Sequence, residues 1–193
     1  MNRGIEAARG QIVAHLHADD YYAHPDVLAL VAAAFGRAAA EGRTLDWAYG
    51  AIEVLKEGRL TVPRPLPPFS YRAFASGRAS IAHPAVFVRR ATLQGAGMFD
   101  ETLRYAMDID LWMRLGAQSV PAVLDQPLAV FRDHAGSVSS SNRLAARREE
   151  WCVRRRYARH APLAFGIYCL RYLKRLPALR AGALQAGAQR KVS

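Results

Sequence analysis

Two adjacent aspartates follow a short apolar run near the start of the chain. The run at 10–16 begins with a glycine and is mostly apolar, which is typical of a short buried strand. Asp19 and Asp20 come shortly after it. In open α/β sheets, ligands bind just beyond the carboxyl ends of the strands, and Mg²⁺ or Mn²⁺ takes carboxylate oxygens and shares them with substrate phosphates. The pair therefore indicates a metal and diphosphate site.

The same two residues also allow a purely structural interpretation. Aspartates ahead of a helix commonly accept hydrogen bonds from the free N–H groups of its first turn. A helix opened by Pro25, with an apolar face from Val27 to Phe35, is expected to follow the pair. Both interpretations of Asp19 and Asp20 stay open at this point.

The elements that must position these residues follow from the hydrophobic pattern. Helices are expected at 2–9, 25–42, 108–115, 143–160 and 163–176, and strands at 10–16, 46–55, 59–62, 82–88 and 128–132. Gly10 is expected to cap the first helix, and Trp112 is expected in the core. The proline-rich stretch 63–68 is a loop, and residues from Pro177 onward are expected to form a loose tail.

Length and composition favour one globular unit with a tail. The chain has 193 residues, of which 51% are hydrophobic. No apolar run approaches the ~18 residues of a spanning helix, and no secretory pattern opens the chain. Cys152 and Cys169 lack the spacing of metal or disulfide motifs, so reduced thiols and a cytoplasmic location are expected.

The net charge of +11 is concentrated at one end. Residues 143–193 carry 13 basic and two acidic residues, whereas the charges before residue 143 cancel. Arg171, Lys174 and Arg175 lie beside aromatic residues, which suits an interfacial position on an anionic membrane. The alternative is a helix packed on the domain with its basic face in water.

Six short islands of sequence occur in the order found in family 2 glycosyltransferases. They are Asn2-Arg-Gly-Ile with Ala8-Arg-Gly, Leu16-His-Ala-Asp-Asp20, His83-Pro-Ala-Val-Phe-Val-Arg-Arg90, Gly97-Met-Phe-Asp100, Met107-Asp-Ile-Asp-Leu-Trp-Met-Arg-Leu115 and Arg132-Asp-His-Ala-Gly-Ser-Val-Ser139. On these residues the chain resembles that family, whose members have a GT-A fold. The resemblance implies an α/β, Rossmann-like mixed sheet flanked by helices in residues 1–142. The charge pattern indicates that a basic helical extension follows at 143–193.

The resemblance also implies roles for the first set of site residues. Asp20 matches the principal ligand of a Mn²⁺ or Mg²⁺ ion, and Asp19 matches a residue that faces the ribose or the donor sugar. His17 stands where another aspartate is common and is expected on the substrate side. His134 matches a histidine near the metal and the diphosphate in some members.

Asp108 matches the carboxylate that acts as general base in these inverting enzymes. Met107 replaces the glutamate that commonly precedes it. Asn2, His83 and Arg114 lie in matching islands and are expected to bind substrate, with His83 bordering the acceptor cleft. A structural role stays open for Asp108 as a helix cap and for His83 as a packed loop residue, and Asp110 is expected to meet solvent or Arg114.

The chemistry of inverting transfer needs both carboxylates. An acceptor hydroxyl attacks the anomeric carbon, a base removes its proton, and a nucleoside diphosphate leaves from the opposite face. Asp20 at the end of a strand and Asp108 at the start of a helix can face each other across a cleft. A helix N-terminus favours the ionised form of Asp108, which a base requires.

Members of the family start further upstream, with strands that hold the nucleotide base. Met1 matches an internal position of the family, so the chain is expected to be either a fragment or a natural truncation. A sheet without its first strands exposes apolar edges near Ile12, Val13 and Leu16.

These expectations define one main function and its rivals. The main one is transfer of a sugar from a nucleoside-diphosphate sugar to a saccharide or lipid-linked acceptor, in surface polysaccharide synthesis, with peripheral contact to an anionic membrane. The first rival is an inactive homologue that acts as a binding module, as a homo-oligomer or paired with a full-length transferase. The second is nucleic-acid binding, but the basic segment has no zinc, RNP or helix-turn-helix pattern, so nucleic acid is not expected as a partner.

Overall fold

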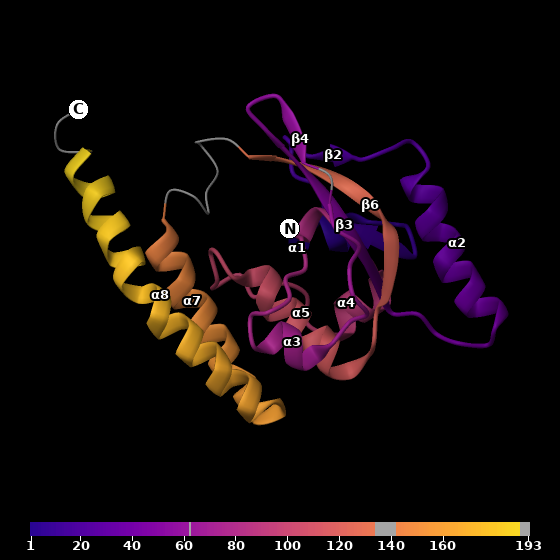
Figure 1. The fold of residues 1–193 in the computed structure, drawn as a ribbon. Helices are drawn as coiled ribbons and strands as arrows, with labels where there is room; N and C mark the ends of the chain where they lie inside the picture. The colour runs from indigo at the N-terminus through magenta and orange to yellow at the C-terminus, as the bar shows by residue number, and fades with distance from the viewer. Residues whose placement is uncertain (62, 134–141, 190–193) are drawn as a thin grey trace.

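A curled sheet with parallel and antiparallel neighbours runs through the middle of the molecule, and helices cover both of its faces (Figure 1). The computed structural model describes residues 1–61, 63–133 and 142–189. The strands are β1 (Ile12–Ala14), β2 (Tyr21–Tyr22), β3 (Trp47–Lys56), β4 (Arg59–Thr61), β5 (Val86–Arg89) and β6 (Ala122–Asp133). The α-helices are α1 (Asn2–Ala7), α2 (Val27–Ala40), α3 (Tyr71–Ala75), α4 (Arg90–Gly95), α5 (Met107–Gln118), α7 (Arg143–Arg156) and α8 (Pro162–Gln189).

The long strands β3 and β6 form the parallel centre of the sheet. The strand order is β1-β5-β3-β6-β2, with β4 added to the far end of β3. The β3–β6 pair is parallel, and the other strand pairs of the described chain are antiparallel. The result is the expected mixed α/β architecture and is consistent with a Rossmann-like fold.

Alternation along the strands assigns side chains to the two layers. Trp47 and Tyr49 of β3 pack into the cluster on the α5 side, whereas Ala48 packs into the cluster under α2. On β5, Phe87 likewise faces α2 while its two neighbours face α5. At 47–51 of β3 and 128–130 of β6 both faces are buried, so these parts of the central strands are apolar rather than alternately polar.

Several expected elements are confirmed. The helix after Pro25, the hairpin of β3 and β4, the proline-rich loop and the helix that contains Asp108 are all present. Trp112 is 2% exposed and stacks on Trp47 with ring centroids 5.9 Å apart, so its expected place in the core is confirmed. Cys152 and Cys169 are free thiols.

Other expectations about the elements are wrong in detail. The first helix ends at Ala7 with Ala8 in an extended conformation, so Gly10 does not cap it. Part of the strand expected at 82–88 is a 3₁₀ turn, His83–Ala85, because Pro84 lacks an N–H for the sheet. Short helices α3 and α4 and strand β2 lack a strong periodic signal and were not expected. Of the apolar residues expected at a bare edge, Val13 is buried and Leu16 is 37% exposed.

The C-terminal helices pack on the body of the protein. α7 lies between α8 and α5, and α8 runs along the outer flank (Figure 1). The expected tail from Pro177 is wrong, because α8 continues through this proline to Gln189. Pro177 lies on the exposed side of α8, where water can hydrogen-bond the carbonyl that its missing N–H leaves free, and the alanine-rich sequence that follows favours helix. None of the helices in the described ranges has the length and hydrophobicity of a membrane-spanning segment.

Gly50 of β3 tests how closely the two central strands approach. The β3–β6 register shifts beside it, and a Cβ atom there would lie 2.6 Å from Cγ of Leu128 and 2.9 Å from the carbonyl oxygen of Gln126. We expect Gly50→Ala to lower the free energy of unfolding by about 1–3 kcal/mol in urea titrations. Gly36→Ala is the matched control, since Gly36 lies exposed in α2 with open space around it, and it should raise that free energy by about 0.5–1 kcal/mol. Equal effects of the two substitutions would contradict the close approach.

Candidate functional site

Asp20 is held in a buried position at the end of the loop that follows β1. Its side chain has no exposed surface, and Oδ1 accepts a hydrogen bond of 3.4 Å from the backbone N–H of Arg132 in β6. Oδ2 has no hydrogen-bond partner among the described residues. Burial raises the pKa of this carboxyl group, and the neighbouring Asp19 raises it further. The helix-capping interpretation of the aspartate pair is wrong, because α2 begins at Val27 after Asp26.

Three histidines form an aromatic cluster beside Asp20. Nδ1 of His17 lies 3.5 Å from Oδ2 of Asp20, and the His17 ring stacks on His83 with centroids 5.2 Å apart. His15 meets His83 edge-on at 5.7 Å. The ring of Phe99 contacts both His15 and His83.

His83 and His15 are kept neutral by their surroundings. Burial lowers the pKa of His83 to about 3, and burial likewise lowers the pKa of His15. Nε2 of each ring is buried without a hydrogen-bond partner in the described part of the chain. A buried polar atom that lacks a partner is costly, and here two such atoms and Oδ2 of Asp20 belong to one cluster. A neutral imidazole can accept or donate one hydrogen bond through such an atom.

Asp108 lies in the first turn of α5, one residue inside the helix. Its Oδ1 accepts a 2.7 Å hydrogen bond from the N–H of Ile109, which lowers the pKa, but burial outweighs this and raises the pKa to about 6. Glu150 of α7 raises it further, whereas His17 lowers it. Backbone N–H groups of the first turn thus favour the ionised form of Asp108, as expected, but burial has the larger effect on its pKa. Asp108 is not the helix cap, because that position belongs to Ala106.

His17 affects the pKa values of both carboxyl groups. It lies next to Asp20 and acts electrostatically on Asp108. A second link runs through His83, whose ring contacts both His17 and Trp112 of α5, with centroids 5.9 Å apart in the latter pair. The structure thus gathers His17, Asp20 and His83 and brings Asp108 within electrostatic reach. Asp19 is exposed beside Asp20.

Asn2 holds the backbone of Phe99, whose ring belongs to the histidine cluster. Its side-chain amide donates to the carbonyl of Phe99 at 2.9 Å and accepts from the N–H of Phe99 at 3.1 Å. Because the Phe99 ring contacts His15 and His83, Asn2 positions that cluster through the backbone of one residue. Its expected contact with substrate stays a prediction.

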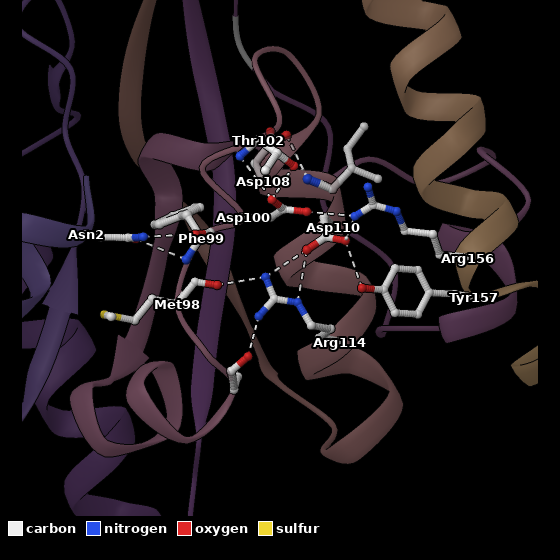
Figure 2. A network of polar contacts seen from close by, with 12 residues as sticks. Asn2, Met98, Phe99, Asp100, Thr102, Asp108, Asp110, Arg114, Arg156 and Tyr157 are labelled. Carbon is white, nitrogen blue, oxygen red and sulfur yellow. Dashed lines mark hydrogen bonds and ion pairs between the residues drawn. The ribbon is translucent and has the colours of Figure 1, made fainter.

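Arg114 is engaged in the network drawn in Figure 2. Its guanidinium donates to Oδ2 of Asp110 through Nε at 3.0 Å and a terminal nitrogen at 2.8 Å, and to the carbonyls of Ala96 and Met98. The expectation that Asp110 meets Arg114 is confirmed. These bonds hold the loop before α5 against the helix, and the expected role of Arg114 in substrate binding stays a prediction.

Residues of the C-terminal segment complete this network. Tyr157 donates a 2.8 Å hydrogen bond to Oδ1 of Asp110, and Arg156 pairs with Asp100 at 2.7 Å (Figure 2). The Glu149 carboxyl group accepts from the N–H groups of Arg104 at 2.6 Å and Tyr105 at 2.7 Å.

The segment at 143–160 therefore holds the loop that leads into Asp108. Sequence reasoning missed this role. A signal was present, because Glu149 and Glu150 are the only acidic residues after Asp133. Two carboxylates in an otherwise basic segment indicate that each has a specific hydrogen-bond or ion-pair partner within the fold.

The divalent-cation site expected at Asp20 stays a prediction. Within residues 1–61, 63–133 and 142–189, no three His, Cys, Asp or Glu side chains are grouped closely enough to hold a metal. Mg²⁺ and Mn²⁺ are commonly held by one or two carboxylates and the phosphates of the substrate. The buried, unpartnered Oδ2 of Asp20 fits one such ligand, and His134 lies outside the described residues.

Comparison with known proteins adds a distant similarity. The chain is 27% identical over 132 residues to uncharacterized glycosyltransferases of Mycobacterium tuberculosis from strains CDC 1551 / Oshkosh and ATCC 25618 / H37Rv. The chain is a distant homologue of proteins named as glycosyltransferases. The match covers 68% of this chain and 48% of each relative, so the chain spans about half the length of the curated relatives it matches. No protein-family model matches the sequence.

The raised pKa of Asp108 has a consequence for stability. The folded state binds the proton of Asp108 more tightly than the unfolded state, so the wild type loses stability as pH rises toward and through about 6. We expect Asp108→Asn to raise the free energy of unfolding above pH 6 by up to about 3 kcal/mol in denaturant titrations. Below about pH 4 the variant and the wild type should be equally stable. Asp125→Asn, at an exposed carboxyl of β6, is the control and should show no such pH-dependent difference. A pH-independent effect of Asp108→Asn would contradict the buried charge.

The contact between Tyr157 and Asp110 is testable by removing one oxygen atom. Asp110 is 2% exposed, so water cannot replace the lost hydroxyl easily. We expect Tyr157→Phe to lower the free energy of unfolding by about 1–3 kcal/mol in chemical denaturation. Tyr172→Phe, at a half-buried tyrosine of α8, should change it by no more than about 0.5 kcal/mol. Similar small effects of both changes would show that the hydroxyl of Tyr157 adds nothing to stability.

Proposed function

We propose that the protein is an inverting, metal-dependent glycosyltransferase of family 2 with a GT-A fold. It moves a sugar from a nucleoside-diphosphate sugar to a saccharide or lipid-linked acceptor, in the synthesis of surface polysaccharide. The main support is the pair Asp20 and Asp108, two carboxyl groups whose pKa values are raised by burial and are both affected electrostatically by His17. The distant similarity to glycosyltransferases agrees with this proposal.

Asp108 is proposed as the general base. In a single displacement, the acceptor oxygen forms a bond to the anomeric carbon while the bond from that carbon to the diphosphate oxygen breaks. The hydroxyl proton passes to the Asp108 carboxylate. A pKa of about 6 keeps most of this group ionised at neutral pH and leaves it basic enough to take the proton.

Asp20 and His134 are proposed to hold the divalent cation. When bound, Mn²⁺ or Mg²⁺ neutralises the negative charge of the departing diphosphate. Asp20 offers its unpartnered Oδ2, and the Arg132 N–H keeps the other oxygen in place. A bound cation would give this buried oxygen a partner of opposite charge.

The remaining site residues are proposed to position the substrates. Asp19, exposed beside Asp20, suits a ribose or donor-sugar hydroxyl. His17 lies next to Asp20 and stacks on the neutral His83, and the two rings can hydrogen-bond substrate hydroxyls there. Asn2 and Arg114 are proposed to support substrate binding by holding the loop at 96–99.

The proposal is tested by assaying release of nucleoside diphosphate from a panel of nucleotide sugars with Mn²⁺. We expect Asp108→Asn to lower kcat about 10²–10⁴-fold while nucleotide binding in calorimetry is kept, because only the proton acceptor is removed. Asp20→Asn should abolish the Mn²⁺ dependence of nucleotide binding. The wild-type rate should fall as pH drops below about 6, where Asp108 becomes protonated.

Asp125→Asn serves as the control variant and should keep the wild-type rate. A folded wild-type chain that binds no nucleotide and turns over no donor would contradict the proposal. That result would favour an inactive homologue that pairs with a complete transferase or with itself.

A further inference from the structure

The outermost helix, α8, presents an apolar face that packs against nothing in the described part of the chain. Its inner face is filled, since Ala164 and Tyr168 are buried against the body of the protein. On the outer face the exposed fractions are 84% for Leu163, 70% for Leu170 and 60% for Leu173, with Ile167 at 41%. Spacings of four, three and three residues place these four side chains on one side of the helix. Single exposed leucines are ordinary, but a row of four is not.

Cations border this apolar face. Lys174 falls within the row, and Arg171 and Arg175 lie along the edge that faces α7. Arg171 donates to the carbonyl of Gly77 at 3.3 Å, which fixes its stem beside the helix. Arg171 and Arg175 line a shallow hollow together with Arg147 of α7.

Few negative charges oppose these cations. Glu150, the acidic residue that lines the hollow, already pairs with Arg147 and with the buried Arg154. No acidic residue follows Glu150 in the sequence. The outer side of α8 therefore combines exposed apolar area with the positive charge of Lys174, and Arg171 and Arg175 add positive charge along the side that faces α7.

This combination selects one kind of partner. A second copy docked through the same face would set cation against cation with no carboxylate on the helix to offset them. The phosphates of a nucleic acid would pair with the cations, but the row of three leucines and Ile167 would stay exposed to water. An anionic bilayer satisfies both, because its acyl boundary accepts the apolar row and its phosphates meet the cations.

We propose that α8 docks lengthwise on an anionic membrane surface. Leu163, Ile167, Leu170 and Leu173 enter the boundary between headgroups and acyl chains. Lys174 reaches the lipid phosphates from within the row, and Arg171 and Arg175 add positive charge along the side of the helix that faces α7. This surface is separate from the histidine cluster, and the proposal does not depend on the proposed transferase activity.

Vesicle sedimentation with the full chain tests the proposal. We expect binding to vesicles that contain phosphatidylglycerol and weak binding to vesicles of phosphatidylcholine alone, with a loss of affinity as salt is added. Leu163→Gln with Leu170→Gln should weaken binding at least about tenfold, because two inserted side chains are lost. Lys174→Gln with Arg175→Gln should weaken it by about fivefold for each charge at low salt.

Matched controls lie elsewhere on the protein. Leu28→Gln changes a leucine of α2 that is 55% exposed, and Arg59→Gln changes an exposed cation of β4. Both should bind vesicles as the wild type does. All variants replace exposed side chains, and thermal unfolding confirms that each is folded.

Four results would overturn the proposal. They are equal binding to neutral and anionic vesicles, no vesicle binding by the folded wild type, vesicle binding that the two leucine substitutions leave unchanged, and self-association in light scattering that the leucine substitutions abolish. Tight RNA binding that depends on Lys174 and Arg175 but not on the leucines, with no vesicle binding, would likewise replace the membrane with a nucleic acid.

Discussion

The buried carboxyl group of Asp110 joins three separate parts of the chain. Arg114 reaches it from the next turn of α5, Tyr157 reaches it from the end of α7, and Arg114 also holds the carbonyls of the loop at 96–98. Breaking one partner of such a buried pair leaves an uncompensated polar group, so each contact constrains the others. The helix that carries Asp108 is positioned by this set of bonds. The C-terminal segment is therefore part of the architecture of the site.

Desolvation sets the protonation of the groups that surround the candidate site. The pKa values of Asp20 and Asp108 rise and those of His15 and His83 fall, and in each case burial is the largest cause. The same physical effect moves acids and bases in opposite directions, and in both cases it favours the neutral form. At neutral pH the effect leaves His83 neutral, with a pKa of about 3, and leaves Asp108 mostly ionised, with a pKa of about 6.

The sequence predicts the long periodic elements well because burial on one or both faces leaves a strong pattern. The helix from Val27, the β3–β4 hairpin and the helix containing Asp108 all have such patterns. The strand β2 has only two residues, and its position depends on pairing with β6. The path of α8 through Pro177 depends on solvent access to one carbonyl, which no local pattern encodes. At the site, the residue types of Asp20, Asp108 and His83 could be predicted, whereas the carboxyl contact of Glu149 with two backbone amides depends on tertiary packing.

The parallel pairing at the centre of the sheet also constrains the order of folding. Ala48 of β3 pairs with Ala122 of β6, and a hairpin, β5 and α5 all lie between them in the sequence. Two parallel strands cannot be joined by a tight turn, so their pairing cannot start at a hairpin. The chain between them must fold or close as a long loop before the two strands pair. Proteins with such high contact order fold slowly and expose apolar strands for longer. During synthesis, β3 is complete long before its central neighbour β6 exists, whereas α2 precedes β3 and β5 precedes β6, so both can cover that strand earlier.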